Sequence, residues 1–360
     1  MKPIIDLTRN ELKKLFFSPV AMLILLIFCF YSASGFARAF EMLLRNQNAG
    51  FAPKSATNLV FASNFSGFYK SLLNYMYLFF PLLTMNIFSR DQSSGSISLL
   101  LSSPLNNRQI VLGKYLSLVI FSLVLIFLIS LVSLYGYIKI ENADPAYVFT
   151  GLFGMFLLCC TYSAIGLFMS SITNHPIVAA IGTLIVLFIL NLVGDLWQEY
   201  PFIRDITYWL SLNGKVVPFI EGFIPSEDLI YFLALIIFFV SLTILRLHTK
   251  REKRSRLHNI MRYSLLALSL CVVAYASRPQ LKKYADLTRE KNNTLSEESQ
   301  RVVSKLSGGI TITTYSNMLD VTGQAALPRY YKRDVELFED YIRFKPEIKM
   351  DYVYYHKYLP

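Results

Sequence analysis

The feature that most constrains this chain is a series of long apolar runs that contain almost no charged side chains. An α-helix of about 20 apolar residues is long enough to cross the hydrocarbon core of a bilayer. Only 16% of the 360 residues are Asp, Glu, Lys or Arg, whereas a soluble domain has roughly a quarter. The sequence therefore predicts an all-α polytopic membrane protein. Seven spans are expected, near Ser18–Phe36, Tyr69–Phe88, Val111–Tyr137, Tyr147–Met169, Ile177–Val193, Leu229–Leu247 and Ile260–Ala276.

The basic residues flank the predicted spans and do not form a single patch. The formal net charge is +11, and the densest basic run is RLHTKREKRSRLH at 246–258. Lys and Arg concentrate on the cytoplasmic side of membrane proteins, so the charge pattern indicates topology and argues against nucleic acid as a partner. It places the N-terminus, the 89–112 loop and the 248–259 run in the cytoplasm, and the C-terminal tail outside.

The N-terminal segment IIDLTRNELKKLFF is amphipathic when its side chains are placed at roughly 100° per residue. This pattern is typical of an interfacial helix lying on the cytoplasmic leaflet. A plain charged segment leading into the first span is the alternative. The apolar stripe comprises Ile4, Ile5, Leu12, Leu15 and Phe16, and the opposite face comprises Asp6, Arg9, Asn10, Lys13 and Lys14.

The segment between the fifth and sixth predicted spans is rich in aromatic residues and repeatedly interrupted. Proline and glycine break helices, so short interfacial or re-entrant helices are expected here instead of one long helix. The interruptions are Pro201, Gly214, Pro218, Gly222 and Pro225.

The tail after residue 277 has the pattern of a small α/β unit. ITITTY and IKMDYVYY are predicted strands, and RDVELFEDYIRF is a predicted helix between them. A capping box formed by Thr294 and Glu297 is expected to begin another helix. A two-stranded sheet leaves its edges exposed, so this unit is expected either to pair with a partner or to be incomplete.

Motifs for catalysis and for nucleotide binding are missing from the sequence. It contains no G-x-x-x-x-G-K-[ST] phosphate loop, no H-E-x-x-H zinc motif and no G-x-S-x-G nucleophile turn. The predicted spans also lack the acidic residues and histidines that ion-coupled carriers usually hold at the membrane midplane. We therefore expect no catalytic residue, no metal and no cofactor, and the chain is not predicted to be an enzyme. Energy for any transport must come from a partner.

Residues 96–115, SISLLLSSPLNNRQIVLGKY, lie between two of the most apolar segments of the chain. Ile97 and the leucines at 99–101 are expected to enter the membrane interface or to pack on helix ends. Pro104 should stop a short helix, and the following NNR at 106–108 should face water. Lys114 is expected to extend toward the lipid head groups. This combination predicts a cytoplasmic docking element, and an ordinary polar loop is the alternative.

The same segment resembles the coupling region of ABC-2 exporter permeases. In that family it runs roughly acidic-x-x-x-Gly-Thr-x-Glu-x-Leu, then Pro, then Ile-x-x-Gly-Lys. This chain matches at Gly95, Leu100, Pro104, Ile110, Gly113 and Lys114. It departs at Ser96, at Ser98 and at Asp91-Gln92, where the family usually has Thr, Glu and a stronger acidic run.

The resemblance covers residues 1–248 and implies a six-span permease bundle with a cytoplasmic coupling helix that seats in a groove of an ATPase. It implies a separate P-loop ABC ATPase and a second permease copy or related subunit as partners, in the bacterial inner membrane. The residues it marks for ATPase coupling are Gly95, Leu100, Pro104, Asn106, Asn107, Arg108, Gly113 and Lys114.

The remainder of the chain, a basic linker with the seventh span (249–277) and the tail (278–360), resembles a second component joined on. Asp286, Thr288, Leu295 and Ser296 are similar to the start of the auxiliary subunit of gliding-motility-type ABC transporters. This likeness implies an extracytoplasmic α/β unit shorter than that of the family, and an auxiliary extracytoplasmic subunit as a further partner.

Two functions are compatible with these observations. The first is the permease subunit of an ABC exporter, which couples ATP hydrolysis by a separate ATPase to substrate translocation. The second is a membrane scaffold of a gliding or secretion apparatus, driven by the same type of ATPase but transporting nothing. The sequence does not identify a substrate, nor whether the subunits form a homodimer or a heterodimer.

Overall fold

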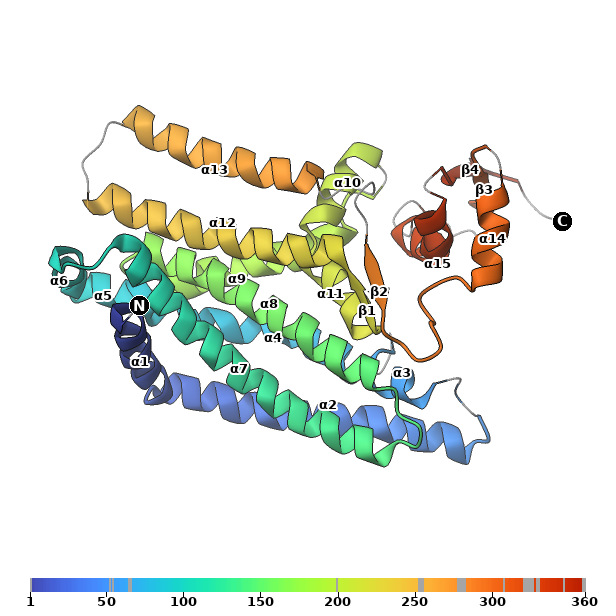
Figure 1. Cartoon of the computed structure of the whole chain (residues 1–360), viewed down its shortest axis with the longest axis horizontal. Coiled ribbons are helices and arrows are strands. Elements are labelled where there is room, and N and C mark those ends of the chain that lie inside the picture. The colour runs from blue at the N-terminus through green and yellow to red at the C-terminus, as the bar shows by residue number, and fades with distance from the viewer. Residues whose placement is uncertain are drawn as a thin grey trace. The chain divides into compact units, whose positions relative to one another are not determined.

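The computed structural model describes residues 2–51, 53, 55–63, 67–198, 200–251, 256–276, 283–306, 308–319, 327, 331–345 and 347–357. These residues are mostly helical (Figure 1). The helices are α1 (Lys2–Phe16), α2 (Pro19–Asn48), α3 (Ala56–Phe61), α4 (Phe68–Thr84), α5 (Asn86–Ser93), α6 (Ser96–Ser102), α7 (Asn107–Lys139), α8 (Pro145–Ile172), α9 (Pro176–Leu192), the 3-10 helix η1 (Val193–Asp195), α10 (Pro201–Leu210), α11 (Leu212–Ile220), α12 (Ser226–Arg251), α13 (Arg256–Ala276), α14 (Glu297–Lys305) and α15 (Tyr331–Phe344). The strands are β1 (Phe223–Pro225), β2 (Tyr284–Asp286), β3 (Thr311–Asn317) and β4 (Lys349–Tyr355).

Five helical segments in the described part of the chain are long and apolar enough to cross a membrane. They are α2, α4 together with α5, α7, α8 and α12. The two remaining predicted spans are also helical, but their apolar helices are shorter, at Pro176–Leu192 and Leu257–Val272. The prediction of a helical polytopic membrane protein is confirmed, whereas the count of seven spans stays a prediction.

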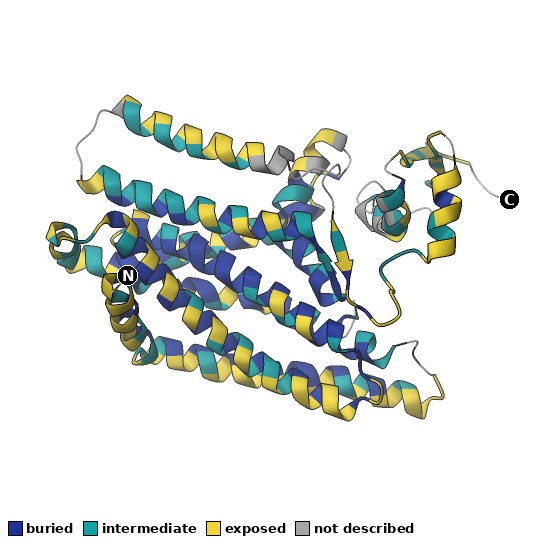
Figure 2. Cartoon of the chain, viewed as in Figure 1, coloured by how far each residue is buried: buried dark blue, intermediate teal, exposed yellow. Residues whose placement is uncertain are grey.

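Helix α8 is the centre of the bundle. In the most apolar 18-residue stretch of α8, 72% of the residues are buried, compared with 33% in the corresponding stretches of α2 and α12. Helix α8 packs against α4, α5, α7 and α12 (Figure 2). Its glycines allow this: a Cβ at Gly151 would lie 2.6 Å from the Tyr69 ring, and one at Gly154 would lie 2.5 Å from Phe219 Cβ. Small residues let helix backbones approach closely in membranes, so α8 can be surrounded on several sides.

The apolar surface that remains exposed lies on the outer faces of the helices, as a lipid-facing surface requires. Phe30 on α2 is 74% exposed, Phe149 on α8 is 71% exposed and Ile237 on α12 is 65% exposed. Exposed apolar surface that is not covered by the rest of the protein is typical of a contact with membrane or with another protein.

The interrupted segment before α12 forms two short helices, α10 and α11, as the prolines and glycines predicted. Strand β1 follows them and pairs with β2, which lies after α13. Ser226 N donates to Lys283 O at 2.9 Å beside this pairing. The chain beyond α13 therefore returns to the start of α12, at the opposite end of that helix from Arg251.

Two compact units make up the chain: residues 1–189 with 215–285, and residues 190–214 with 286–360. In the second unit β3 and β4 form a parallel two-stranded sheet, with Thr311 opposite Lys349 and α15 as the connection. The predicted β-α-β unit is therefore present. The predicted domain boundaries near 248 and 277 stay predictions.

The predicted start of the helix after residue 294 needs correction. Helix α14 begins at Glu297, and its cap is Ser296, whose hydroxyl accepts from Ser299 N at 3.2 Å. Thr294 instead donates its hydroxyl to Asp286 Oδ2 at 2.7 Å. That carboxylate orders the loop before the helix, so the threonine is not free to act as the cap.

Candidate functional site

The segment between α5 and α7 is a short helix followed by a turn (Figure 1). Gly95 has φ 74°, a left-handed conformation that glycine adopts without strain, and α6 begins at the next residue. It ends at Ser102 because Ser103 is extended, at φ −68° and ψ 159°, as residues before proline tend to be. Asn106 then precedes α7 as its N-cap. The predicted short helix that stops before Pro104 is confirmed.

None of the residues of α6 is buried, although four of the seven are apolar. Leu99 is 74% exposed, and Leu100 is half-buried. Of the two predicted placements, packing on helix ends is not met at Leu99, and entry into the membrane interface stays a prediction. An apolar side chain held in the open on a short helix between two spans is suited to contact with another molecule.

The predicted water-facing residues after Pro104 do not all face water. Asn106 and Arg108 are exposed, but Asn107 is only 3% exposed. The prediction is wrong there because α7 begins at Asn107, four residues before the predicted start of the span. The side chain of Asn107 therefore lies against the end of α12, where its Oδ1 accepts from Arg251 Nη1 at 3.3 Å.

Lys114 does not extend toward the lipid head groups, because it is fully buried. Its Nζ lies 2.7 Å from Asp91 Oδ2 on α5 and 3.1 Å from Glu11 Oε1 on α1. It also donates to Ile87 O at 2.8 Å and lies 5.1 Å from the centre of the Phe88 ring. A buried charge must be paired and hydrogen-bonded to be tolerated, and Lys114 has both kinds of partner. One ammonium group thus joins α1, α5 and α7.

Helix α1 packs directly on α7, with Gly113 at the contact. A Cβ at that position would lie 2.8 Å from Leu7 Cδ2, and Thr8 Oγ1 donates to Gly113 O at 3.0 Å. The predicted amphipathic helix is present, and its charged face is exposed. Its buried side, however, is centred on Thr8, Glu11 and Leu15, while Ile5 is 62% exposed.

Helix α8 holds the other side of α5 through Ser170. The Ser170 hydroxyl accepts from Phe88 N at 3.0 Å and from Ser89 N at 3.1 Å, and it donates to Met85 O at 2.9 Å. The first N–H groups of a helix have no partner within that helix, and Phe88 N is one of them in α5, so Ser170 satisfies it. Gln92 Nε2 extends the contact by donating to Ser171 O at 3.0 Å.

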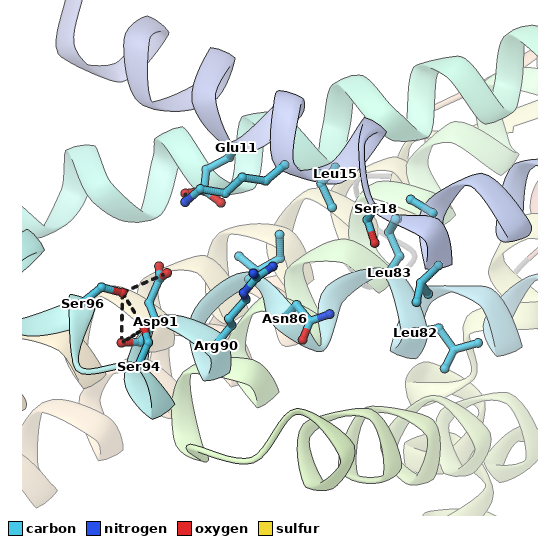
Figure 3. A pocket seen from close by; sticks show the side chains of 14 residues that line it. Glu11, Leu15, Ser18, Leu82, Leu83, Asn86, Arg90, Asp91, Ser94 and Ser96 are labelled. Carbon is cyan, nitrogen blue, oxygen red and sulfur yellow. Dashed lines mark hydrogen bonds and ion pairs between the residues drawn. The ribbon is translucent and has the colours of Figure 1, made fainter.

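A pocket with a cavity volume of about 350 Å³ opens between the α1–α2 corner and α4–α5 (Figure 3). Figure 3 shows Arg90 reaching from α5 toward α1, with Glu11 on the facing helix. Partial burial lowers the pKa of Lys14 on α1, but the hydrogen bond to Glu11 and the nearby carboxylates raise it more, so the net shift is upward. The lining also includes Asp91, Ser94 and Ser96, which are linked by hydrogen bonds.

One comparison with known proteins bears on this arrangement. A sequence model of the family described as ABC-2 family transporter protein matches residues 6–276, about three quarters of the chain. The chain belongs to this family. No curated protein matches it. The match begins in α1, includes the α5–α7 segment and continues past residue 248 to the end of α13.

Membership of the ABC-2 family makes the chain a multi-pass membrane protein and a membrane permease component of an ABC transporter. It also implies an ABC ATPase as partner. The family match includes most of α1, and in the structure Lys114 of α7 pairs with Glu11 of α1 and with Asp91 of α5.

Glu11 is the site residue that sequence reasoning missed. The amphipathic pattern of α1 assigns Glu11 to neither face, and the sequence predicts that Lys114 extends toward the lipid head groups without a carboxylate partner. The available signal was a single lysine inside the apolar start of a long span, which requires a carboxylate nearby. Among the residues marked for coupling, the structure brings Gly113 and Lys114 into contact with α1, and brings Asn106, Asn107 and Arg108 to the end of α12.

Proposed function

We propose that the chain is the permease subunit of an ABC exporter, in which α6 and the following turn seat on a separate ATPase. The exposed α6 between α5 and α7 is the observation that carries this proposal. A helix of seven residues with no buried side chain contributes little to the packing of the bundle. Its sequence matches the coupling pattern of ABC-2 permeases at Gly95, Leu100 and Pro104.

The contacts behind α6 support a role in transmitting force. Helix α5 is bonded to α7 and α1 through Lys114, and to α8 through Ser170. When the ATPase closes on nucleotide, displacement of α6 would therefore move α5, α7 and α1 together against α8. Nucleotide binding and hydrolysis belong to the ATPase in this scheme, since the permease sequence lacks a phosphate loop.

The complex would contain a second permease copy or a related subunit, in the bacterial inner membrane. The N-terminus and α6 lie in the cytoplasm in this proposal, and the C-terminal tail lies outside. Within the first unit, the two ends of α12 support placing α6 and Lys283 on opposite sides of the membrane. Arg251 donates to Leu105 O at 3.1 Å at one end, and Ser226 contacts Lys283 at the other. The likeness of the tail to a gliding-type auxiliary subunit, and the scaffold alternative, stay predictions.

Replacing Pro104 with alanine tests the coupling role of α6. Alanine lacks the ring that keeps Ser103 extended, so α6 can continue toward α7 and its exposed face is displaced. We expect less ATPase to co-purify with the variant from membranes, and substrate-dependent ATP turnover to fall in parallel. Insertion in the membrane should be unaffected, because no span is altered.

Pro145→Ala is the matched control. Pro145 is the first residue of α8, after the loop at the far end of α7, and its replacement should leave ATPase recovery at the wild-type level. Wild-type recovery of ATPase with Pro104→Ala would mean that α6 is an ordinary loop, and would remove the main support for the proposal.

Cysteine labelling tests the orientation. In a background lacking the four native cysteines, Ser98→Cys on α6 and Glu298→Cys on α14 offer exposed positions. A membrane-impermeant maleimide should label position 298 in intact cells, and position 98 only after the membrane is permeabilised. The reverse pattern would invert the orientation, and labelling of both positions in intact cells would place α6 and α14 on the same side.

A further inference from the structure

A second pocket lies at the junction of the α6–α7 turn with the end of α12. Its cavity volume is about 460 Å³, and its lining is made only of polar and basic residues. The pocket beside α1 is lined in part by Leu15, Leu82 and Leu83, whereas no residue with an apolar side chain lines this one. The lining residues are Asn106, Asn107, Arg108, His248 and Arg251.

The pocket collects positive charge from two helices. Arg108 lies in the first turn of α7, and Arg251 is the last residue of α12. The N-terminus of α7, a long helix, adds the partial positive charge of the helix dipole. In the part of the chain that the structure describes, neither arginine forms an ion pair with a carboxylate, and no acidic residue lines the pocket. Glu252 lies outside the described residues.

Two hydrogen-bonding groups at the pocket have no partner among the described residues. Asn107 is 97% buried, given its 3% exposure, and its Nδ2 is unbonded although its Oδ1 accepts from Arg251. The ring nitrogen Nδ1 of His248 is also buried and unbonded. Buried polar groups are nearly always hydrogen-bonded in native proteins. An incoming acceptor with two oxygens would satisfy the amide group of Asn107 and pair with the guanidinium groups.

We propose that this pocket receives an aspartate or glutamate side chain of the partner ATPase. The inference rests on the proposed coupling role of α6 and deepens it by naming the chemistry of one contact. A carboxylate fits because guanidinium groups bind it through paired N–H donors. The absence of an apolar wall from the lining disfavours a phospholipid, whose acyl chains would need one. The contact would also tie α12 to the ATPase, in addition to the helices that flank α6.

The test measures binding of the purified ATPase to the full-length permease in nanodiscs of uncharged lipid, over a range of NaCl concentrations. Arg108→Gln and Arg251→Gln should each raise the Kd about tenfold or more, and each should make binding less dependent on salt. Arg45→Gln is the control, because Arg45 is an exposed arginine near the end of α2, paired with Glu41. It should leave the Kd unchanged. Arg108→Glu should be rescued by one Asp→Lys or Glu→Lys change on the ATPase.

The outcomes separate this inference from the proposed function. Wild-type Kd for both arginine variants, together with weakened binding of Pro104→Ala, would overturn the carboxylate contact while leaving the coupling role intact. Wild-type Kd for all three variants would overturn both. An arginine effect seen only in nanodiscs with anionic lipid would assign the pocket to a lipid phosphate and overturn the inference. A Glu252→Gln variant that weakens binding as much as Arg108→Gln would also overturn the inference. The pocket would then hold the carboxylate of Glu252 and not one from the ATPase.

Discussion

Replacing Lys114 with methionine is expected to destabilise the permease by about 3–5 kcal/mol, the usual effect of breaking a buried ion pair. Methionine fills a similar volume but removes the ammonium group that pairs with Asp91, and it leaves Glu11 with only the exposed Lys14. Both carboxylates are largely withdrawn from solvent, with side-chain exposures of 13% and 5%. The expected result is a much lower yield of monodisperse protein and a lower apparent melting temperature in detergent.

The matched control is Lys14→Gln. Lys14 also pairs with Glu11, at 2.9 Å, but its side chain is 57% exposed, and exposed pairs contribute at most about 1 kcal/mol. A small effect at Lys14 with a large one at Lys114 would show that burial of the ammonium group decides the outcome.

A rescue experiment separates charge from packing. Lys114→Met combined with Asp91→Asn and Glu11→Gln removes all three charges and leaves neutral groups of similar shape. We expect the triple variant to recover much of the lost stability, since replacing a whole buried ionic cluster is often neutral. A Lys114→Met variant as stable as the wild type would show that the ion pairs do not hold α1, α5 and α7 together.

The stable triple variant would also show what the charges do for function. If stability returns but ATPase activity no longer responds to substrate, the ion pairs serve transmission between helices and not only folding. Neutral hydrogen bonds are weaker than charge-assisted ones, so α1 and α5 would be less firmly connected to α7.

Most helices and strands could be predicted from the sequence, whereas the side-chain contacts between them could not. Apolar runs predicted the helices because spanning a bilayer requires length and hydrophobicity, which are local properties. Pro104 predicted the end of α6, since its effect is exerted on the preceding residue. The tail strands followed from their β-branched residues. These features depend on neighbours in sequence.

Lys114, Asn107 and Ile5 could not be placed in the same way. Whether a lysine at a span end reaches solvent or is buried depends on what lies 23 and 103 residues away, at Asp91 and Glu11. The buried face of α1 is set by Gly113 of α7, which admits Leu7, so apolar periodicity alone pointed to the wrong centre. The start of α7 at Asn107 follows from polar residues that can cap and extend a helix beyond the hydrocarbon, which hydropathy does not detect.

Adding a single methyl group at Gly166 is expected to disrupt the contact between α8 and the end of α4. A Cβ there would lie 2.1 Å from Thr84 Oγ1 and 2.7 Å from Thr84 Cβ. The hydroxyl could rotate, but Cβ is fixed to the backbone, so α8 and α4 would have to separate. Overpacking of this kind typically costs about 1–3 kcal/mol.

Gly182→Ala provides the matched control, because the new Cβ would meet only Met169 Cε, at 2.7 Å. That atom ends a flexible side chain and can move away. Gly182→Ala should therefore be neutral, or slightly stabilising through better helix propensity. Apparent melting temperatures in detergent compare the two variants directly, and equal values would contradict the steric argument.

The position of Gly166 makes this contact relevant to coupling as well as to stability. Thr84 is the last residue of α4, and Ser170, one turn after Gly166 on α8, bonds to the start of α5. A separation of α8 from α4 at Gly166 would lengthen the hydrogen bonds that Ser170 accepts from α5. It would also change the orientation of α5 and therefore the position of α6. We expect Gly166→Ala to lower ATPase recovery, and Thr84→Gly in the same chain to restore part of it by removing the opposing Cβ. Failure of Thr84→Gly to restore any stability would mean that the clash lies elsewhere on α8.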